Sequence, residues 1–155
     1  MRLTYPRLLC AISVVCGLLG CSGAPSPPST YPVSGKVTLN GKPVEGANLT
    51  FIPKTAGDGA TASGSTDAEG NYRLFQGSLN GAQPGSYKVI LEAWVPKPGA
   101  SIPAEMKNDK GQLAAMGLAT QVIPTKYVDP AQTDLSADVD PNPAGNTFNF
   151  DLVSQ

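Results

Sequence analysis

The sequence of 155 residues contains no histidine. Histidine is the commonest general base, the side chain that titrates near neutral pH and the commonest metal ligand. Its absence excludes many enzyme classes and the metal sites that depend on imidazole. Charged residues make up only 15% of the chain, with 11 basic against 12 acidic residues. This balance gives no basic footprint for nucleic acid, so we expect no nucleic-acid partner.

Cysteine is almost as scarce, with three residues in the chain. Cys10 and Cys16 lie in an apolar segment near the N-terminus, and Cys21 follows directly after it. If that segment is removed on export, no pair of cysteines remains to form a disulfide, even in an oxidising compartment. The stability of the mature protein must then come from packing and strand pairing, and a thiol-based mechanism is excluded.

The N-terminal segment has the organisation of a bacterial export signal. Met1 to Arg7 is short and positively charged, and Leu8 to Leu19 is apolar. The apolar run is shorter than the about 20 residues that a membrane-spanning helix needs. It ends in Leu18-Leu19-Gly20-Cys21, which resembles the lipobox of bacterial lipoproteins, where the signal peptidase cuts before a lipid-bearing cysteine. The alternative is an ordinary secretory signal with a cysteine there by chance.

This resemblance implies that residues 1–20 are removed and that a lipid on Cys21 anchors the protein to a membrane. Several acyl chains, at about 0.8 kcal/mol for each buried methylene, give durable anchoring. Residues 21–32 then form the lipidated cysteine and a tether rich in proline and serine, without a periodic apolar face. Ser22 is not the aspartate that commonly signals retention in the inner membrane. We therefore expect a protein of the cell envelope, at the outer membrane rather than the inner one.

Residues 33–155 show the period-two alternation of half-buried β-strands. Val33, Val37 and Leu39 share one face of the first predicted strand, and Asn40-Gly41 follows as a strong hairpin signal. Further alternating runs begin at Ala47, Tyr72, Tyr87, Leu135 and Phe148. The chain also has 17 glycines and 15 prolines, which indicates many turns.

These patterns predict an all-β fold, a single antiparallel β-sandwich of about seven strands. Gly57 to Gly64 is small and polar and is expected to be a loop. A loop excursion is expected at about 96–124, where prolines and a polar run interrupt the alternation, with a helical turn over Gln112 to Leu118.

The order and spacing of several short stretches resemble the carboxypeptidase regulatory-like domain, a transthyretin-like or immunoglobulin-like β-sandwich. These stretches are Val33–Val37, Leu39–Val44, Gly46–Ala47, Thr66–Tyr72, Pro84–Val89, Ile123–Tyr127 and Asn146–Leu152. The closing stretches are similar to the ends of small bacterial lipoproteins built on this domain. The resemblance implies an accessory or adhesive module. The catalytic and hormone-binding residues of related proteins have no matching motif here.

Two hydroxyl and amine pairs have the residue types of a serine–lysine nucleophile. Ser34 with Lys36, and Ser86 with Lys88, lie two residues apart and so share a strand face. The alternation requires polar residues on that outer face in any case. Neither pair lies in a known serine hydrolase motif, so a solvated surface is favoured.

Five carboxylates have the side-chain chemistry for metal binding or hydrolysis. Asp134, Asp138 and Asp140 could offer oxygen ligands to calcium, although the last two lie on the expected solvent face. Asp67 and Glu69 are the acidic pair that an alternative function, hydrolysis of a cell-wall or exported substrate, would use. Glycoside hydrolysis needs two facing carboxylates at a defined separation in a cleft, which a small sandwich rarely provides.

The segment around Asp67 partly mimics the start of a calcium loop. The twelfth position of such a loop is a bidentate glutamate, whereas counting from Asp67 it is Ser78 here. We therefore predict a tight turn in which the Asp67 carboxylate accepts a local backbone N–H bond. Gly70 is expected to take a backbone conformation that is costly for other residues.

The sequence as a whole predicts a membrane-anchored, non-catalytic β-sandwich without cofactor or metal. Its partner would be an envelope protein or a polysaccharide, or the domain would be a structural module. Trp94 and Tyr127 are the candidates for contact with a ligand or partner, as an aromatic platform. Single aromatic residues also commonly pack under a loop, which is the alternative for both. The alternative function is the carboxylate-dependent hydrolase.

The anchor can be tested by replacing the cysteine that would carry the lipid. We expect Cys21→Ala to remain unprocessed or to appear as a soluble exported form, because no thiol is left to acylate. Fractionation of cells, with metabolic labelling by a fatty acid, measures this. Retention of the variant in the membrane without bound lipid would contradict the anchor.

Overall fold

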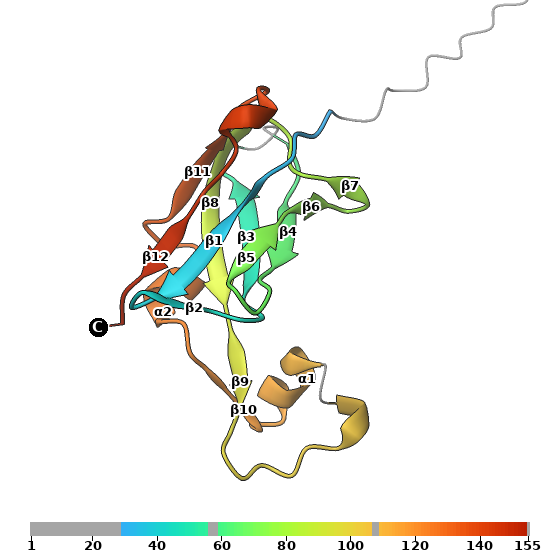
Figure 1. Ribbon diagram of the computed structural model, residues 1–155, viewed down its shortest axis with the longest axis vertical. Helices are drawn as coiled ribbons and strands as arrows, with labels where there is room; N and C mark the ends of the chain where they lie inside the picture. The colour runs from blue at the N-terminus through green and yellow to red at the C-terminus, as the bar shows by residue number, and fades with distance from the viewer. Residues whose placement is uncertain (1–28, 56–58, 107–108, 155) are drawn as a thin grey trace, which may run out of the picture.

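The structure is a computed structural model that describes residues 29–55, 59–106 and 109–154. In this part of the chain two β-sheets pack on each other, and an excursion of ribbon and short helices projects from one end (Figure 1). None of its helices has the length and apolar character needed to cross a membrane. The export signal, Cys21 and the tether up to residue 28 lie outside the described residues, so the predictions of export and lipidation stay predictions.

The smaller sheet is built around its first strand. Its members are β1 (Ser34–Leu39), β2 (Lys42–Pro43), β5 (Asn71–Arg73) and β12 (Phe150–Leu152). β1 pairs antiparallel with β5 over its first half and with β2 over its second half, and it pairs parallel with β12. Asn40 and Gly41 both have positive φ, 52° and 76°, which confirms the predicted hairpin turn between β1 and β2.

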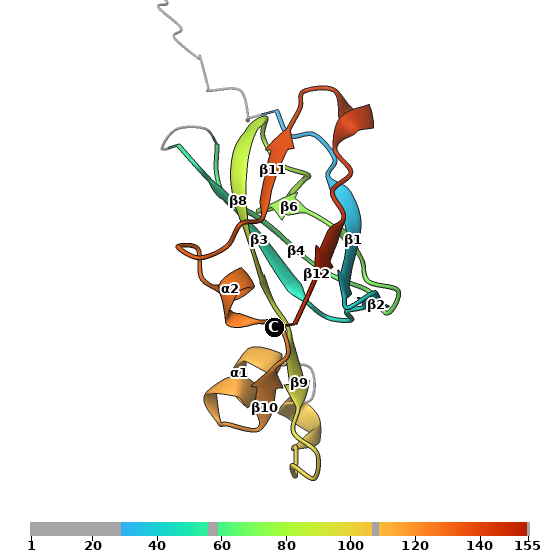
Figure 2. The ribbon, with the colours of Figure 1, turned by 90° about the vertical axis from the view of Figure 1, so that its left-hand side faces the viewer.

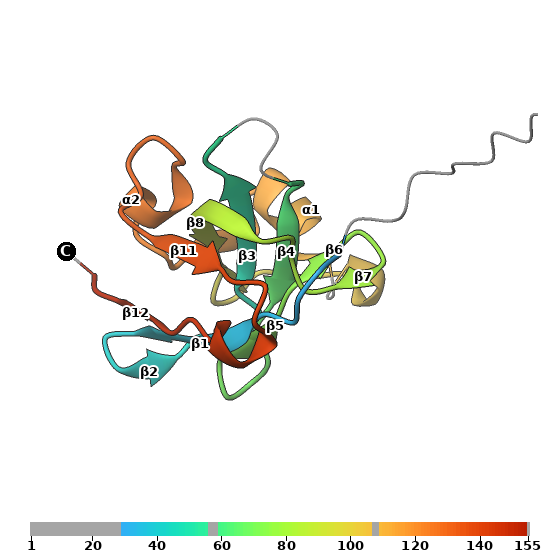
Figure 3. The ribbon, with the colours of Figure 1, turned by 90° about the horizontal axis from the view of Figure 1, so that it is seen from above.

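The larger sheet has the order β11-β8-β3-β4-β6-β7, and each neighbouring pair is antiparallel. Its strands are β3 (Asn48–Pro53), β4 (Ala62–Ser65), β6 (Phe75–Gln76), β7 (Leu79–Asn80), β8 (Gly85–Glu92) and β11 (Ser136–Val139). Seen from above, this sheet forms one layer and the smaller sheet the other (Figure 3). The predicted all-β sandwich is confirmed.

The core lies between the two layers and is centred on an aromatic cluster. The ring of Phe51 lies 6.0 Å from that of Tyr87, 6.3 Å from Phe148 and 6.1 Å from Phe150, measured between centroids. Tyr72 stacks on Phe150 and donates its hydroxyl hydrogen bond to the Phe148 carbonyl at 2.8 Å. Burial raises the pKa of Tyr72, so the hydroxyl stays protonated and keeps this hydrogen bond.

Three details of the predicted strands are corrected. The described residues form twelve strand segments instead of about seven, since several are only two or three residues long. The expected loop from Gly57 to Gly64 is wrong at its end, because β4 begins at Ala62. This strand was missed since Ala62 is its one buried apolar residue. The third correction is that β12 pairs parallel with β1. The chain before β12 returns to the start of β1, where the Asn146 carbonyl accepts the Ser34 N–H, so the two strands run in the same direction.

The excursion at about 96–124 is present and has more regular structure than predicted. It contains η1 (Ala104–Met106), α1 (Lys110–Ala115) and β10 (Ala119–Gln121), and β10 pairs with β9 (Trp94–Pro96). The predicted helical turn therefore exists, two residues earlier than expected. Figure 2 shows this ribbon and α1 below the sandwich, and α2 (Thr125–Val128) at the lower end of β8.

The assignment of the core can be tested at Phe150, which is 6% exposed in the aromatic cluster. We expect Phe150→Ala to lower the free energy of unfolding by about 3–5 kcal/mol, as truncation of a buried aromatic ring does. Phe75→Ala is the matched control, because Phe75 is 46% exposed and outside the core. Chemical denaturation measures both, and equal losses for the two variants would contradict the assignment.

Candidate binding groove

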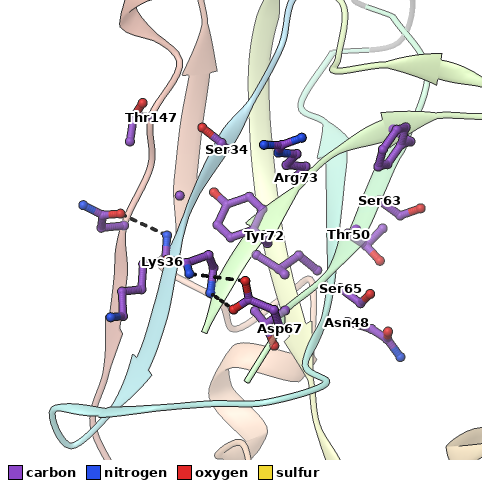
Figure 4. Close-up of a pocket in the computed structure, with 17 residues that line it drawn as sticks. Ser34, Lys36, Asn48, Thr50, Ser63, Ser65, Asp67, Tyr72, Arg73 and Thr147 are labelled. Atoms are coloured by element: carbon purple, nitrogen blue, oxygen red, sulfur yellow. Dashed lines mark hydrogen bonds between the residues drawn. The ribbon is translucent and has the colours of Figure 1, made fainter. Parts of the chain in front are cut away.

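An open groove of about 1200 Å³ lies on the outer surface, where strands of both sheets meet. Its lining comes from β1, β3, β4, β5 and β6 and from the segment just before β12 (Figure 4). Most of the side chains that line it are short hydroxyls and amides, among them Ser34, Asn48, Thr50, Ser63, Ser65 and Thr147. Short side chains leave the groove open along the surface of the strands.

The groove exists because one stretch of chain passes from the smaller sheet to the larger. In Asn71–Gln76, β5 pairs with β1 and β6 pairs with β4, and the fully buried Leu74 lies between them. This crossing brings the backbone close to β4: a Cβ atom on Gly64 would lie 2.1 Å from the Arg73 carbonyl oxygen. Gly64 therefore permits the crossing, and the outward side chains of both sheets border one groove.

The strand register places the polar side chains in rows across the larger sheet. Thr50 lies opposite Ser63, and Ser63 lies opposite Phe75. In the next row Asn48 lies opposite Ser65. A row of hydroxyls thus leads to an aromatic ring that is 46% exposed.

Six of the polar side chains that line the groove are not used by the fold. Ser34, Asn48, Thr50, Ser63 and Ser65 make no side-chain hydrogen bond within the described part of the chain. Thr147 behaves in the same way. These groups are therefore available as donors and acceptors for a molecule in the groove.

Two cations and one carboxylate lie among the residues that line the groove. Lys36 comes from β1 and Arg73 from β5, and neither has an ion-pair partner among the described residues. The backbone N–H of Lys36 donates to the Asn149 side chain at 3.0 Å, which ties β1 to the segment before β12. The carboxylate belongs to Asp67.

The Asp67 carboxylate holds the turn that was predicted for this segment. It accepts the backbone N–H of Asn71 at 2.7 Å and that of Glu69 at 3.1 Å. Desolvation raises the pKa of Asp67, but the hydrogen bonds from Asn71 and Glu69 and the charge of Lys36 outweigh it and hold the pKa below its usual value. The group is thus an ionised acceptor occupied by its own backbone, which suits a turn better than a general acid.

The other candidates from the sequence lie elsewhere. Ser86 donates its hydroxyl hydrogen bond to the Asp138 carboxylate opposite it on β11, and Asp140 accepts the backbone N–H of Asn142. Among the described residues no group of three or more acidic, cysteine or histidine side chains is placed to hold a metal ion. Of the two hydroxyl and amine pairs, only Ser34 with Lys36 lies in the groove.

Trp94 and Tyr127 do not form a shared platform. Tyr127 is 4% exposed and packs in the core, and its hydroxyl accepts the Val153 N–H at 3.3 Å. Tyr127 is therefore a packing residue, which was the alternative to ligand contact, and its ring has no free face for a ligand. Trp94 is half-buried and lines a separate pocket of about 570 Å³, together with Leu39, Val44 and Pro96.

The groove residues Phe75 and Arg73 are not among the candidates predicted from the sequence. The signal was present, because Tyr72 and Leu74 are buried and alternation then places Arg73 and Phe75 on the outer face. Alternation alone therefore places an aromatic ring among the outward-facing polar residues. The contribution of β4 could not be found in the same way, since its alternation is too weak.

Comparisons with known proteins add little to this description. No protein-family model matches the sequence, and no curated protein does. Among solved structures, the chain is similar to the dioxygenase domain of a dioxygenase carbohydrate-binding protein fusion from the cellulolytic bacterium Streptomyces sp. SirexAA-E. The identity is 21%, the match covers 84% of this chain and 82% of the other, and the TM-score is 0.32. A likeness at this level supports no argument about activity.

The turn beside the groove can be tested at Gly70, which has a φ of +81°. A Cβ atom there would lie 2.6 Å from the Val37 carbonyl oxygen. Gly77 has a φ of +61° with no atom within 4 Å of its ideal Cβ position, so it is the matched control. We expect Gly77→Val to cost about 1–3 kcal/mol of stability from backbone strain alone. Gly70→Val should cost more, and equal losses in chemical denaturation would contradict the close packing of this turn.

Proposed function

We propose that the protein is a membrane-tethered, non-catalytic binding module of the cell envelope. On this proposal the lipid on Cys21 holds it to the membrane, and the β-sandwich retains another envelope component. The proposal also includes the resemblance to carboxypeptidase regulatory-like domains, because an accessory or adhesive module would have such a role. The outer membrane is the favoured location.

The observation that carries the proposal is the open groove with its unused hydrogen-bonding groups. A β-sandwich needs polar residues on its outer faces, but it does not need them gathered in a concavity of about 1200 Å³. Concave surfaces with convergent polar groups are where proteins hold ligands. The groove therefore supports a binding role better than a purely structural one.

The position of the first described residues agrees with a tethered module. The described chain begins at the end of the sandwich opposite the β9–β10 ribbon and α1, as Figures 1 and 2 both show. A tether attached there leaves the excursion at the far end. The groove opens between the two ends, along the side of the strands.

The hydrolase alternative has weaker support. It needs two facing carboxylates, one of them able to hold a proton. Asp67, with a lowered pKa, is occupied by its turn, and Glu69 belongs to the same exposed turn. The neighbouring groove side chains are hydroxyls, amides and cations, which bind but do not form a glycosidase acid–base pair.

Site-specific photo-crosslinking in the native envelope tests the proposal. A photoreactive residue in place of Ser63 samples the groove, and one in place of Ser101, an exposed serine of the excursion, is the matched control. We expect a crosslinked envelope component at Ser63 and none at Ser101. The absence of a specific crosslink at Ser63, with the protein correctly localised, would contradict the proposal.

A further inference from the structure

We propose that the groove binds a linear polysaccharide that carries anionic groups, carboxylate or sulfate. This inference rests on the proposed binding function and names its ligand class. It is carried by four features of the described residues: the hydroxyl rows, the exposed ring of Phe75, the pair of cations and the continuation of the groove into a second cleft.

The chemistry of the lining favours a glycan over a protein partner. The buried centre of a protein–protein interface is rich in apolar and aromatic residues and poor in serine. The middle of this groove shows the opposite, with Thr50, Ser63 and Ser65 side by side on β3 and β4. Sugar hydroxyls both donate and accept hydrogen bonds, as do these side chains.

Phe75 gives the groove its apolar contact. Its ring lies in the same row as Ser63 and Thr50 and is 46% exposed, although the core lies on the other face of the strand. A sugar ring has an apolar C–H face beside its hydroxyl edges, so it can stack on an aromatic ring while neighbouring hydroxyls bind its edge. The row Phe75, Ser63 and Thr50 presents both surfaces together.

The positive charges of Lys36 and Arg73 favour an anionic polysaccharide over a neutral one. Lys36 and Arg73 lie on neighbouring strands, since β1 and β5 pair from Ser34 opposite Arg73 to Lys36 opposite Asn71. A guanidinium binds carboxylate or sulfate oxygens through two parallel hydrogen bonds. Asp67, the one carboxylate among the described residues that line the groove, interacts with the charge of Lys36 and offsets part of it. Two cations against one carboxylate leave the groove locally cationic in a chain with net charge −1.

The groove is also longer than one sugar ring requires. Asn48 and Ser65 line both the groove and a second cleft of about 570 Å³ beside α1. This cleft is also lined by Glu105, Asp109 and Lys110, so its carboxylates outnumber its one ammonium. A polymer whose anionic groups lie beside Lys36 and Arg73 can continue past Asn48 with its hydroxyl groups, whereas a monosaccharide would leave much of this surface empty.

The test measures binding of the full chain, extracted in detergent, to three soluble polymers. These are polygalacturonate, which carries carboxylates, dextran sulfate, which carries sulfates, and dextran, which is uncharged. We expect binding to one or both anionic polymers, weakened by added salt, and much weaker binding to dextran. The anionic polymer that binds more tightly shows whether the groove prefers carboxylate or sulfate groups.

Two groove variants and two matched controls locate the site. Phe75→Ala should weaken binding by about fivefold or more, as loss of an aromatic contact residue does. Met116→Ala, at a residue that is 54% exposed and outside the groove, should bind as the unchanged protein does. Arg73→Gln should weaken binding to the anionic polymers, while Lys97→Gln, at an exposed lysine of the excursion, should not. The melting temperature of each variant serves as the control for folding.

The outcomes separate this inference from the proposed function. Equal binding of dextran and the anionic polymers would overturn the anionic selectivity, and an equal loss in Arg73→Gln and Lys97→Gln would show non-specific attraction. If no polymer binds but Ser63 still crosslinks to an envelope protein, the polysaccharide inference fails and the binding function stands. If neither polymer nor crosslinked component is found, both fail.

Discussion

The passage of Asn71–Gln76 from one sheet to the other is the constraint on which the rest of the structure depends. It requires Leu74 in the core at the point of crossing and a glycine at position 64 beneath the Arg73 carbonyl. It closes one side of the sandwich by a covalent connection instead of a further strand pair. The same crossing carries Arg73 and Phe75 out to the surface next to Ser63, so that the fold and the groove have one origin.

The predicted fold agrees with the structure where burial is one-sided and regular. In β8 the buried residues Tyr87, Val89 and Leu91 alternate with partly exposed ones, and such a strand can be recognised without any tertiary information. β4 could not be predicted, because Ser63 and Ser65 are on the solvent side and Gly64 is required by a crossing that only the tertiary structure reveals. The parallel pairing of β12 depends in the same way on where the preceding loop returns the chain.

The candidate site was less accessible from the sequence than the fold. Asp67 and its turn could be predicted, because an Asx turn is local and its hydrogen bonds reach only to Glu69 and Asn71. The groove joins Ser34, Thr50, Ser63 and Thr147, which are far apart in the chain, and hydroxyl residues are so common on outer strand faces that none of them draws notice alone. Tyr127 illustrates the opposite error, since an isolated aromatic residue is conspicuous in the sequence but is buried in the core.

The proposed tether would join the sandwich directly before β1, which has a mechanical consequence. A protein anchored at Cys21 that holds a polymer would carry tension from the N-terminal end of β1, along the strand axis. The Tyr31–Ala82 backbone pair and the bond from Thr30 to the Asn80 carbonyl would bear the load first. Beyond them β1 is held by β5 and β12 on its two sides, so their hydrogen bonds would be sheared together instead of opening one at a time. The strand that would receive the pull also borders the groove, so the route of force from the proposed ligand to the membrane would be short.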